Sequence, residues 1–170
     1  MDFGEPAPTM ILTINLNSEC IDKLDISPAQ TVIEAVLAKG SLAASEQLVF
    51  EIDYPTDPQD PRELSEIPEV RLWFLRLDAR YPWLPVLLIG NSGEFARYTA
   101  MLVPHQFHRS EGIKFNPEAL EIFIMQKIFV VSDWLFSINA PSKFKLMTMA
   151  QMLGYELDEA FFETVVMGNK

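Results

Sequence analysis

Hydrophobic and polar residues alternate along residues 9–16 and again along 47–53, as they do in a strand with one buried face. Between these two segments, apolar residues recur at the spacing of a helix. Pro28, preceded by a serine, is a typical helix start, and Gly40 is a typical helix end. The pattern therefore predicts a strand, a helix over 28–39 and a second strand.

The next part of the chain is apolar in almost every position. Residues 70–77 place large apolar side chains on both faces of an extended chain, which is typical of a central strand. Residues 90–93 (GNSG) form a turn signal between two further apolar segments. We therefore predict strands at 70–77, 85–89 and 94–103, arranged as a meander.

The sequence of the carboxy-terminal third predicts helices. Asn116 and Pro117 supply an N-cap and a proline at the first helical position, and the helix they start is predicted over 117–137. It is apolar on nearly every side, which predicts a buried helix at the centre of the fold. Two shorter helices, 143–153 and 158–167, are predicted to pack as a helical hairpin. The fold class is therefore α+β, with a mostly antiparallel sheet packed on a long buried helix.

Composition agrees with one domain. The chain has 170 residues, of which 49% are hydrophobic, enough to bury a core without disulfides or metals. Residues 54–68 contain four prolines and several acids without any apolar period. We expect a single domain over residues 1–170 in which 54–68 is a mobile acidic loop.

Several classes of protein are excluded by what the chain lacks. Its apolar runs are shorter than the roughly 20 residues needed to cross a bilayer, and the amino terminus does not read as a secretory signal. The one cysteine, Cys20, cannot form an internal disulfide. We expect a cytoplasmic protein without membrane insertion.

Charge is distributed unevenly. Residues 1–70 carry 14 acidic and 3 basic side chains, and residues 71–170 carry 10 of each, so the net charge of −11 resides in the first part. Binding to nucleic acid is unfavourable, because phosphates require a basic surface. The acids form either a solvated surface that maintains solubility or a face for a basic partner.

No arrangement of residues indicates catalysis. His105 and His108 form an H-x-x-H motif, but no further histidine or second cysteine is present to complete a zinc site, and the simpler interpretation is two polar histidines in a loop. We expect no metal and no cofactor. The alternative is an enzyme of unknown type in which His105 or His108 meets a carboxylate in a deep pocket.

Residues 71–134 contain all three tryptophans, both histidines and five of the six arginines. Tryptophan and arginine supply much of the binding energy at protein interfaces. In one interpretation Arg80, Trp83 and Arg97 lie around the turns of the predicted meander and form a patch for a protein partner. In the other, Asp78 and nearby carbonyls satisfy one or two of the arginines.

The same region resembles a known family. Its text includes EIPEVRLWFLRLDARYPWLPVLL, ARYTAMLVPHQ, FNPEALEIFIMQKIFV and MAQMLGYELDEAFF. These collinear motifs, over roughly residues 66–165, resemble the chlororespiratory reduction family of cyanobacteria and chloroplasts, specifically its sixth named member. Residues 1–65 carry no matching motif, and Ile89–Gly93 (IGNSG) departs from the Asp-Trp-rich turn associated with the family.

The resemblance implies a non-catalytic assembly factor, which is stromal in chloroplast relatives. It would act as a chaperone for the hydrophilic connecting arm of the photosynthetic NAD(P)H dehydrogenase-like complex, helping the iron–sulfur subunit of that arm mature or become incorporated. With one cysteine, the chain cannot hold a cluster in the four-cysteine manner and would recognise that subunit as a protein. We expect the contacts to come from Arg80, Trp83, Arg97, His105 and Gln106. A self-associating structural protein is a further alternative.

Overall fold

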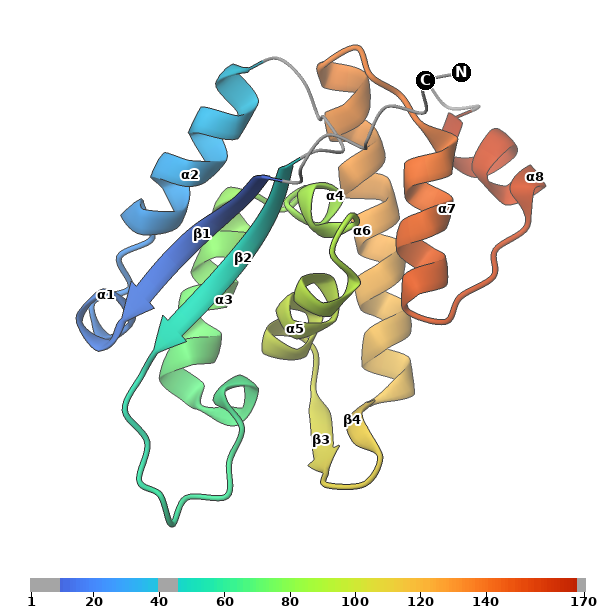
Figure 1. The fold of residues 1–170 in the computed structure, drawn as a ribbon. Coiled ribbons are helices and arrows are strands. Elements are labelled where there is room, and N and C mark those ends of the chain that lie inside the picture. Colours follow the sequence, from blue (N-terminus) through green and yellow to red (C-terminus); the bar gives the residue numbers. More distant parts are fainter. Residues whose placement is uncertain (1–9, 40–45, 168–170) are drawn as a thin grey trace, which may run out of the picture.

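The computed structural model describes residues 10–39 and 46–167. Its elements surround a core built from a small parallel sheet and the helices behind it (Figure 1). In chain order they are β1 (Met10–Asn17), α1 (Ser18–Asp22), α2 (Ser27–Ala38), β2 (Glu46–Asp53), the short 3₁₀ helix η1 (Leu64–Glu66), α3 (Pro68–Arg80), α4 (Pro85–Leu88), α5 (Ser92–Leu102), β3 (His105–His108), β4 (Gly112–Phe115), α6 (Pro117–Ser137), α7 (Lys143–Met152), α8 (Glu159–Phe161) and the π-helical turn η2 (Phe162–Met167).

The strands and the helix predicted for the first part of the chain are confirmed. β1 and β2 pair in parallel, with Ile14 opposite Phe50, because the chain returns through α2 before the second strand begins. α2 starts one residue earlier than predicted, at Ser27, whose backbone N–H donates to the Asp25 carboxylate at 3.0 Å. Gly40, expected as the end of this helix, lies outside the described residues.

The meander predicted over 70–103 is wrong, because these residues form the helices α3, α4 and α5. In α3 the buried side chains are Val70, Trp73, Phe74 and Leu77, a helical spacing. Leu72 and Leu75, which made the segment read as apolar on both faces, are 52% and 46% exposed. The sequence pattern therefore could not separate the buried residues from the exposed ones.

The turn signal at 90–93 is a helix start instead of a hairpin. The Asn91 side chain accepts a hydrogen bond from the backbone N–H of Glu94 at 3.4 Å, so Asn91 is the N-cap of α5. The hairpin of the structure comes later, where β3 and β4 pair in antiparallel register. The α+β class is confirmed, but the longer sheet is parallel and the antiparallel sheet consists of this short hairpin.

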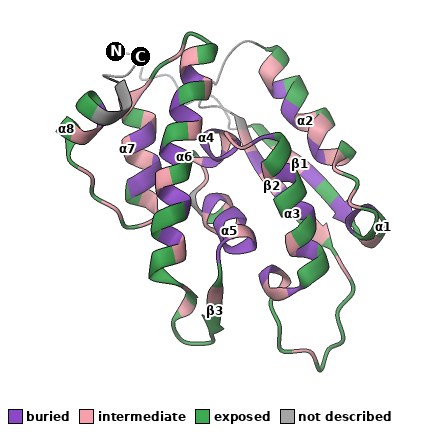
Figure 2. Ribbon diagram, turned by 180° about the vertical axis from the view of Figure 1, so that it is seen from behind, coloured by how far each residue is buried: buried purple, intermediate pink, exposed green. Residues whose placement is uncertain are grey.

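Helix α6 begins as the sequence predicts, with the Asn116 side chain accepting from the backbone N–H of Ala119 at 3.0 Å. One face of α6 packs into the core, and its buried residues are Leu120, Phe123, Ile124, Lys127, Ile128, Val131, Ser132 and Leu135. Ile122 and Phe129 on the outer face are 70% and 41% exposed. Figure 2 shows buried and exposed positions alternating along the helix, so it is half-buried and not enclosed on all sides.

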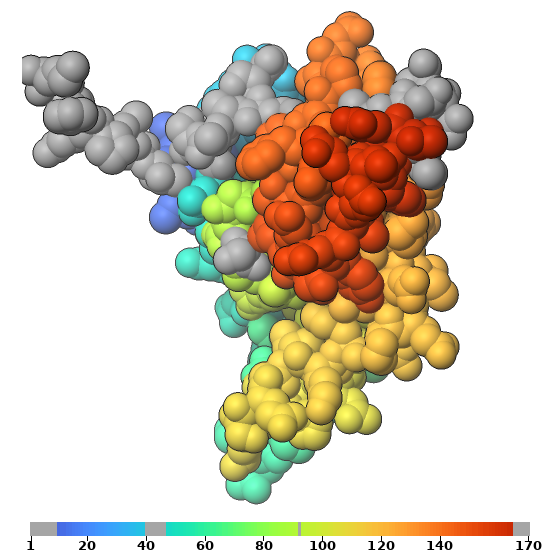
Figure 3. Space-filling model, turned by 90° about the vertical axis from the view of Figure 1, so that its right-hand side faces the viewer, coloured from blue at the N-terminus to red at the C-terminus, as the bar shows by residue number. Residues whose placement is uncertain are grey.

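The carboxy-terminal helices form the predicted hairpin and pack against α6. In Figure 3 the red carboxy-terminal surface lies directly against the orange-yellow surface of the preceding part of the chain. Lys143 at the start of α7 donates to the carboxylates of Glu159 at 2.6 Å and Glu163 at 2.9 Å, which ties the two arms together. Asp158 caps α8 by accepting from the backbone N–H of Ala160 at 3.0 Å.

Candidate partner-binding surfaces

An aromatic and cationic cluster surrounds the turn between α3 and α4. Trp83 stacks on Trp134 of α6, with ring centroids 4.2 Å apart and an interplanar angle of 5°. Tyr81 meets the edge of Trp83 at 5.5 Å, and the Arg80 guanidinium lies 5.9 Å from the Tyr81 ring. Arg80 is exposed and both tryptophans are half-buried, so this cluster presents rigid apolar area beside an exposed cation.

Tyr81 also connects this cluster to α2. Its hydroxyl donates to the Glu34 carboxylate at 3.2 Å. The pKa of Tyr81 is raised, mainly because burial disfavours the charged phenolate, and Glu34 adds to the effect. The phenol therefore stays a hydrogen-bond donor and fixes the turn that carries Arg80 and Trp83.

Arg97 lies elsewhere, at the outer edge of β2. Its guanidinium donates to the Phe50 carbonyl at 2.8 Å, while the Glu94 carboxylate accepts from the Phe50 N–H at 3.0 Å. Arg97 and Glu94 are themselves 3.6 Å apart. These two side chains from α5 satisfy the backbone groups that a neighbouring strand would otherwise bind, and so they cap the sheet edge.

A groove lies beside Arg97. It has a volume of about 660 Å³ and lies at the carboxyl ends of β1 and β2. Polar side chains dominate its lining, which consists of Asn15, Leu16, Asn17, Phe50, Glu51, Ile52, Asp53 and Arg97.

His105 is held by two neutral partners. Its Nδ1 lies 2.9 Å from the Val103 carbonyl and its Nε2 lies 2.9 Å from the Ser65 hydroxyl. A carbonyl only accepts, so Nδ1 carries a proton, and in the neutral ring Nε2 then accepts from the Ser65 hydroxyl. The enzyme alternative required a carboxylate at hydrogen-bond distance, whereas these two partners are a hydroxyl and a carbonyl. The pair instead links η1 to the β3–β4 hairpin.

Gln106 is exposed on β3, next to His105 and paired in register with Lys114 of β4. It borders a shallow depression of about 410 Å³ between the hairpin and the start of α6. The interpretation of His105 and His108 as loop residues is wrong, because both belong to β3.

The five predicted contact residues therefore occupy three places. Arg80 and Trp83 belong to the end of α3 and the turn before α4, and Figure 1 shows α4 near the centre of the molecule, whereas β3, which carries His105 and Gln106, projects at the bottom. Arg97 lies between them on α5. The single patch around a meander is not formed, since the three residues expected to share it are positioned by helices.

Sequence reasoning missed a buried polar network. Lys127 of α6 is 2% exposed and contacts the carboxylate of Asp78, and its ammonium also donates to the Pro82 carbonyl at 3.1 Å. The Tyr98 hydroxyl donates to the same carboxylate at 2.5 Å. A lysine inside the apolar run of α6 was the available signal, because a buried charge requires a partner.

Neither a metal-binding cluster nor a membrane-spanning helix is found in residues 10–39 and 46–167. Within these ranges no three His, Cys, Asp or Glu side chains are arranged to hold a metal ion. None of the helices described there is long and apolar enough to cross a membrane. Cys20 is buried, and its thiol donates to the Asn17 carbonyl at 3.1 Å.

The fold and these surfaces define a class: an α+β protein whose candidate sites are exposed patches and shallow grooves. Residues 16–164 match the chlororespiratory reduction 6 family, and the chain belongs to that family. The match confirms the resemblance and extends it toward the amino terminus. Membership implies a role in chlororespiratory reduction and in assembly of the NAD(P)H dehydrogenase complex. No solved structure matches the chain.

Proposed function

We propose that this protein is a non-catalytic assembly factor for the hydrophilic connecting arm of the photosynthetic NAD(P)H dehydrogenase-like complex. In this role it helps the iron–sulfur subunit of the arm mature or become incorporated. It acts in the cytoplasm of cyanobacteria, which corresponds to the stroma in chloroplast relatives. The family match over residues 16–164 carries the proposal.

The side chains of this protein support binding to another protein and do not support binding of an iron–sulfur cluster. Its single cysteine, Cys20, is buried at the start of α1, where its sulfur contacts the backbone of Asn17 at 3.1 and 3.2 Å. A cluster requires several exposed thiolates, which one capping cysteine cannot supply. The subunit that receives the cluster is therefore bound through its protein surface.

The cluster around Trp83 is the best contact surface for that subunit. The stack of Trp83 on Trp134 and the contact of Arg80 with Tyr81 hold large side chains in place before binding. Preorganised side chains lose little conformational entropy when a partner covers them. Arg97, His105 and Gln106 remain candidates for secondary contacts.

Deletion of the gene in a cyanobacterium tests this function. Native gel electrophoresis and immunoblotting are expected to show loss of the connecting arm from the complex while the membrane arm persists. The iron–sulfur subunit is expected to accumulate outside the complex. Expression of the parent chain in the deletion strain is expected to restore the complete complex. A deletion strain with the complete complex at its normal level would rule the proposal out.

A further inference from the structure

One face of the β1–β2 sheet has no cover among the described elements. Ile14, Leu16 and Phe50 point into the core, where Phe50 meets Phe74 of α3 with ring centroids 5.1 Å apart. Figures 1 and 2 show α3 on this inner side, with the strands in front of it in one view and behind it in the other. Parallel sheets in proteins are normally covered on both faces, so the open face requires an explanation.

The open face changes character along the strands. Thr13 of β1 pairs in register with Val49 of β2, and these side chains are half-buried. Asn15 then pairs with Glu51, and Asn17 with Asp53; these four residues are exposed and line the groove of about 660 Å³. The groove therefore presents two carboxylates and the Asn15 amide at positions set by the strand register, while the Asn17 side chain caps α1.

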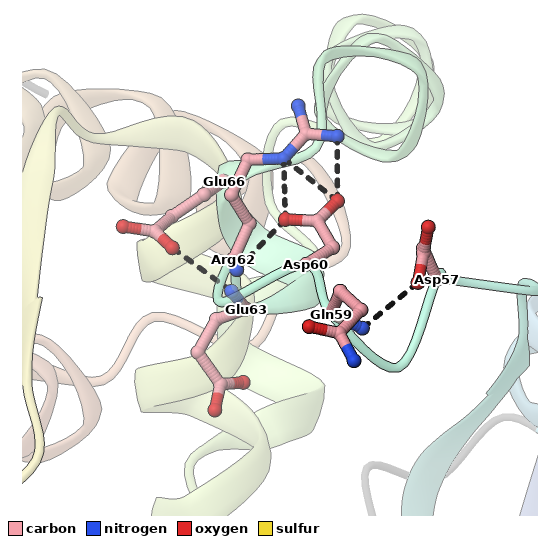
Figure 4. A network of polar contacts seen from close by, with 6 residues as sticks. All are labelled: Asp57, Gln59, Asp60, Arg62, Glu63 and Glu66. Carbon is pink, nitrogen blue, oxygen red and sulfur yellow. Dashed lines mark hydrogen bonds and ion pairs between the residues drawn. The ribbon is translucent and has the colours of Figure 1, made fainter.

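The loop that follows β2 adds negative charge at the same end of the sheet. It carries Asp57, Asp60 and Glu63, and its one base is Arg62. Figure 4 shows that the Arg62 guanidinium is already engaged by the Asp60 carboxylate, through contacts of 2.8 to 3.1 Å. Arg62 therefore neutralises its neighbour and does not offset the charge of Glu51 and Asp53.

The edge of β2 is closed to a partner strand at its centre. Phe50 has both backbone groups bound by Glu94 and Arg97, so a strand that added along this edge would have to displace both side chains. The face has no such obstruction. A partner segment therefore fits across the face, with the Arg97 guanidinium bordering the groove on one side.

We propose that this open face binds an extended basic segment of a protein partner, with lysine or arginine side chains paired to Glu51 and Asp53. The side-chain oxygen of Asn15 accepts a hydrogen bond from the same cations, whereas that of Asn17 already accepts from the Cys20 N–H at 2.9 Å. Charge complementarity selects this occupant, since residues 1–70 carry a net charge of −11 and repel nucleic acids and anionic membranes. The inference rests on the proposed function only for the identity of the physiological partner.

The test is a titration of the ¹⁵N-labelled full chain with two soluble peptides, Ac-KTRTKTR-NH₂ and its acidic counterpart Ac-ETDTETD-NH₂, followed by NMR. We expect the basic peptide to shift the amide signals of residues 13–17 and 49–53, and the acidic peptide to leave them unchanged. The double variant Glu51→Lys, Asp53→Lys is expected to weaken binding of the basic peptide at least about tenfold, because two ion pairs become repulsive contacts.

The matched control is Glu121→Lys, Glu156→Lys, which makes the same change in net charge at exposed positions away from the sheet. It is expected to bind the basic peptide within about twofold of the parent, and circular dichroism verifies that both variants fold. Equal weakening in the two variants, or shifts located away from the sheet, would overturn the inference. The titration uses no component of the complex, so its failure leaves the assembly function standing, while a normal complex in the deletion strain removes the function and not the groove.

Discussion

Lys127 of α6 and Asp78 of α3 form an ion pair inside the protein, although they lie 49 residues apart in the chain. The lysine side chain is 2% exposed and the aspartate side chain is 24% exposed. Tyr98 of α5 donates to the same carboxylate, so three helices meet at Asp78. A buried ammonium is costly without a counter-ion, and this pair therefore fixes how α6 sits on the helices behind the sheet.

The two partners of this pair are expected to differ in their effect on stability. Asp78→Ala leaves the buried Lys127 ammonium without a counter-ion and is expected to lower the free energy of unfolding by about 3–5 kcal/mol. Lys127→Met is expected to cost less, because Asp78 keeps its Tyr98 donor and some contact with water. Urea unfolding followed by circular dichroism measures both, and the double variant is expected to be more stable than Asp78→Ala alone. Equal losses in the two single variants would contradict this account.

Stability is expected to fall as the pH rises above about 10. Burial, then the charge of Asp78, then the hydrogen bond to it, raise the pKa of Tyr98 well above its usual value. An unfolded tyrosine releases its proton near pH 10, while the folded phenol keeps it, so ionisation of the unfolded chain favours unfolding above that pH. Below it the contribution is constant.

The variant Tyr98→Phe isolates this effect. Its urea midpoint is expected to decrease less steeply between pH 9 and pH 11 than that of the parent, because the phenyl ring that replaces the phenol cannot ionise in either state. Tyr54, Tyr81 and Tyr155, whose pKa values are also raised by burial, are present in both chains and cancel in the comparison. If the urea midpoints of the parent and of Tyr98→Phe decrease equally with pH, groups other than Tyr98 cause the loss of stability at alkaline pH.

Trp83→Ala is expected to weaken binding of the isolated iron–sulfur subunit about 30-fold, which corresponds to about 2 kcal/mol for one interface anchor. Isothermal titration calorimetry measures the affinity. The variant Trp83→Phe keeps an aromatic ring stacked on Trp134, so it distinguishes loss of the stacking contact from loss of the indole group. Arg109→Ala, at an exposed position, is the surface control. If folded Trp83→Ala binds the subunit as tightly as the parent does, the cluster around Trp83 is not the contact surface.

Limited proteolysis is expected to cut the loop after β2 before any other part of the described chain. Arg62 and Glu63 are exposed there, and the segment has no apolar period. Ser65→Ala removes the hydrogen bond to His105 and is expected to accelerate cleavage at Arg62 by trypsin. Thermal unfolding of the parent is expected to show one transition, and two separated transitions would contradict the single domain.

The purified protein is expected to contain no stoichiometric metal. Elemental analysis by mass spectrometry provides the measurement, and one zinc or iron per chain would reopen the enzyme alternative. His105 is the informative residue, because its two ring nitrogens are already engaged by Ser65 and Val103. A metal at His105 would have to break one of these contacts.

The sequence predicted the starts of α6 and α8 correctly from local caps, but at Asn91 an equally local cap was interpreted as a hairpin turn. Asn116 caps the residue three positions later, and Asp158 caps the residue two positions later, so each signal lies within one short window of sequence. The alternation of β1 and β2 was readable for the same reason. The sequence also indicated a surface role for Trp83 without indicating its partner, Trp134.

In residues 70–103 the local pattern of apolar residues did not predict the secondary structure correctly. Large apolar side chains occupy so many of its positions that the periods of strand and helix both fit. Packing decided between them: Trp73 and Phe74 are buried against each other, and Phe74 packs on Phe50 of the sheet, while Leu72 and Leu75 are exposed. That distinction depends on which surface the helix meets.

The sequence by itself therefore determined the family, the α+β class, the caps of the later helices and the uneven charge. Tertiary structure alone decided that Lys127 meets Asp78, that Arg97 caps β2 at Phe50, and that one sheet face is open beside Glu51 and Asp53. The physical reason is how far apart in the sequence the interacting residues lie. Capping and alternation act between residues a few positions apart, whereas ion pairs and sheet edges join groups that only the folded chain brings together.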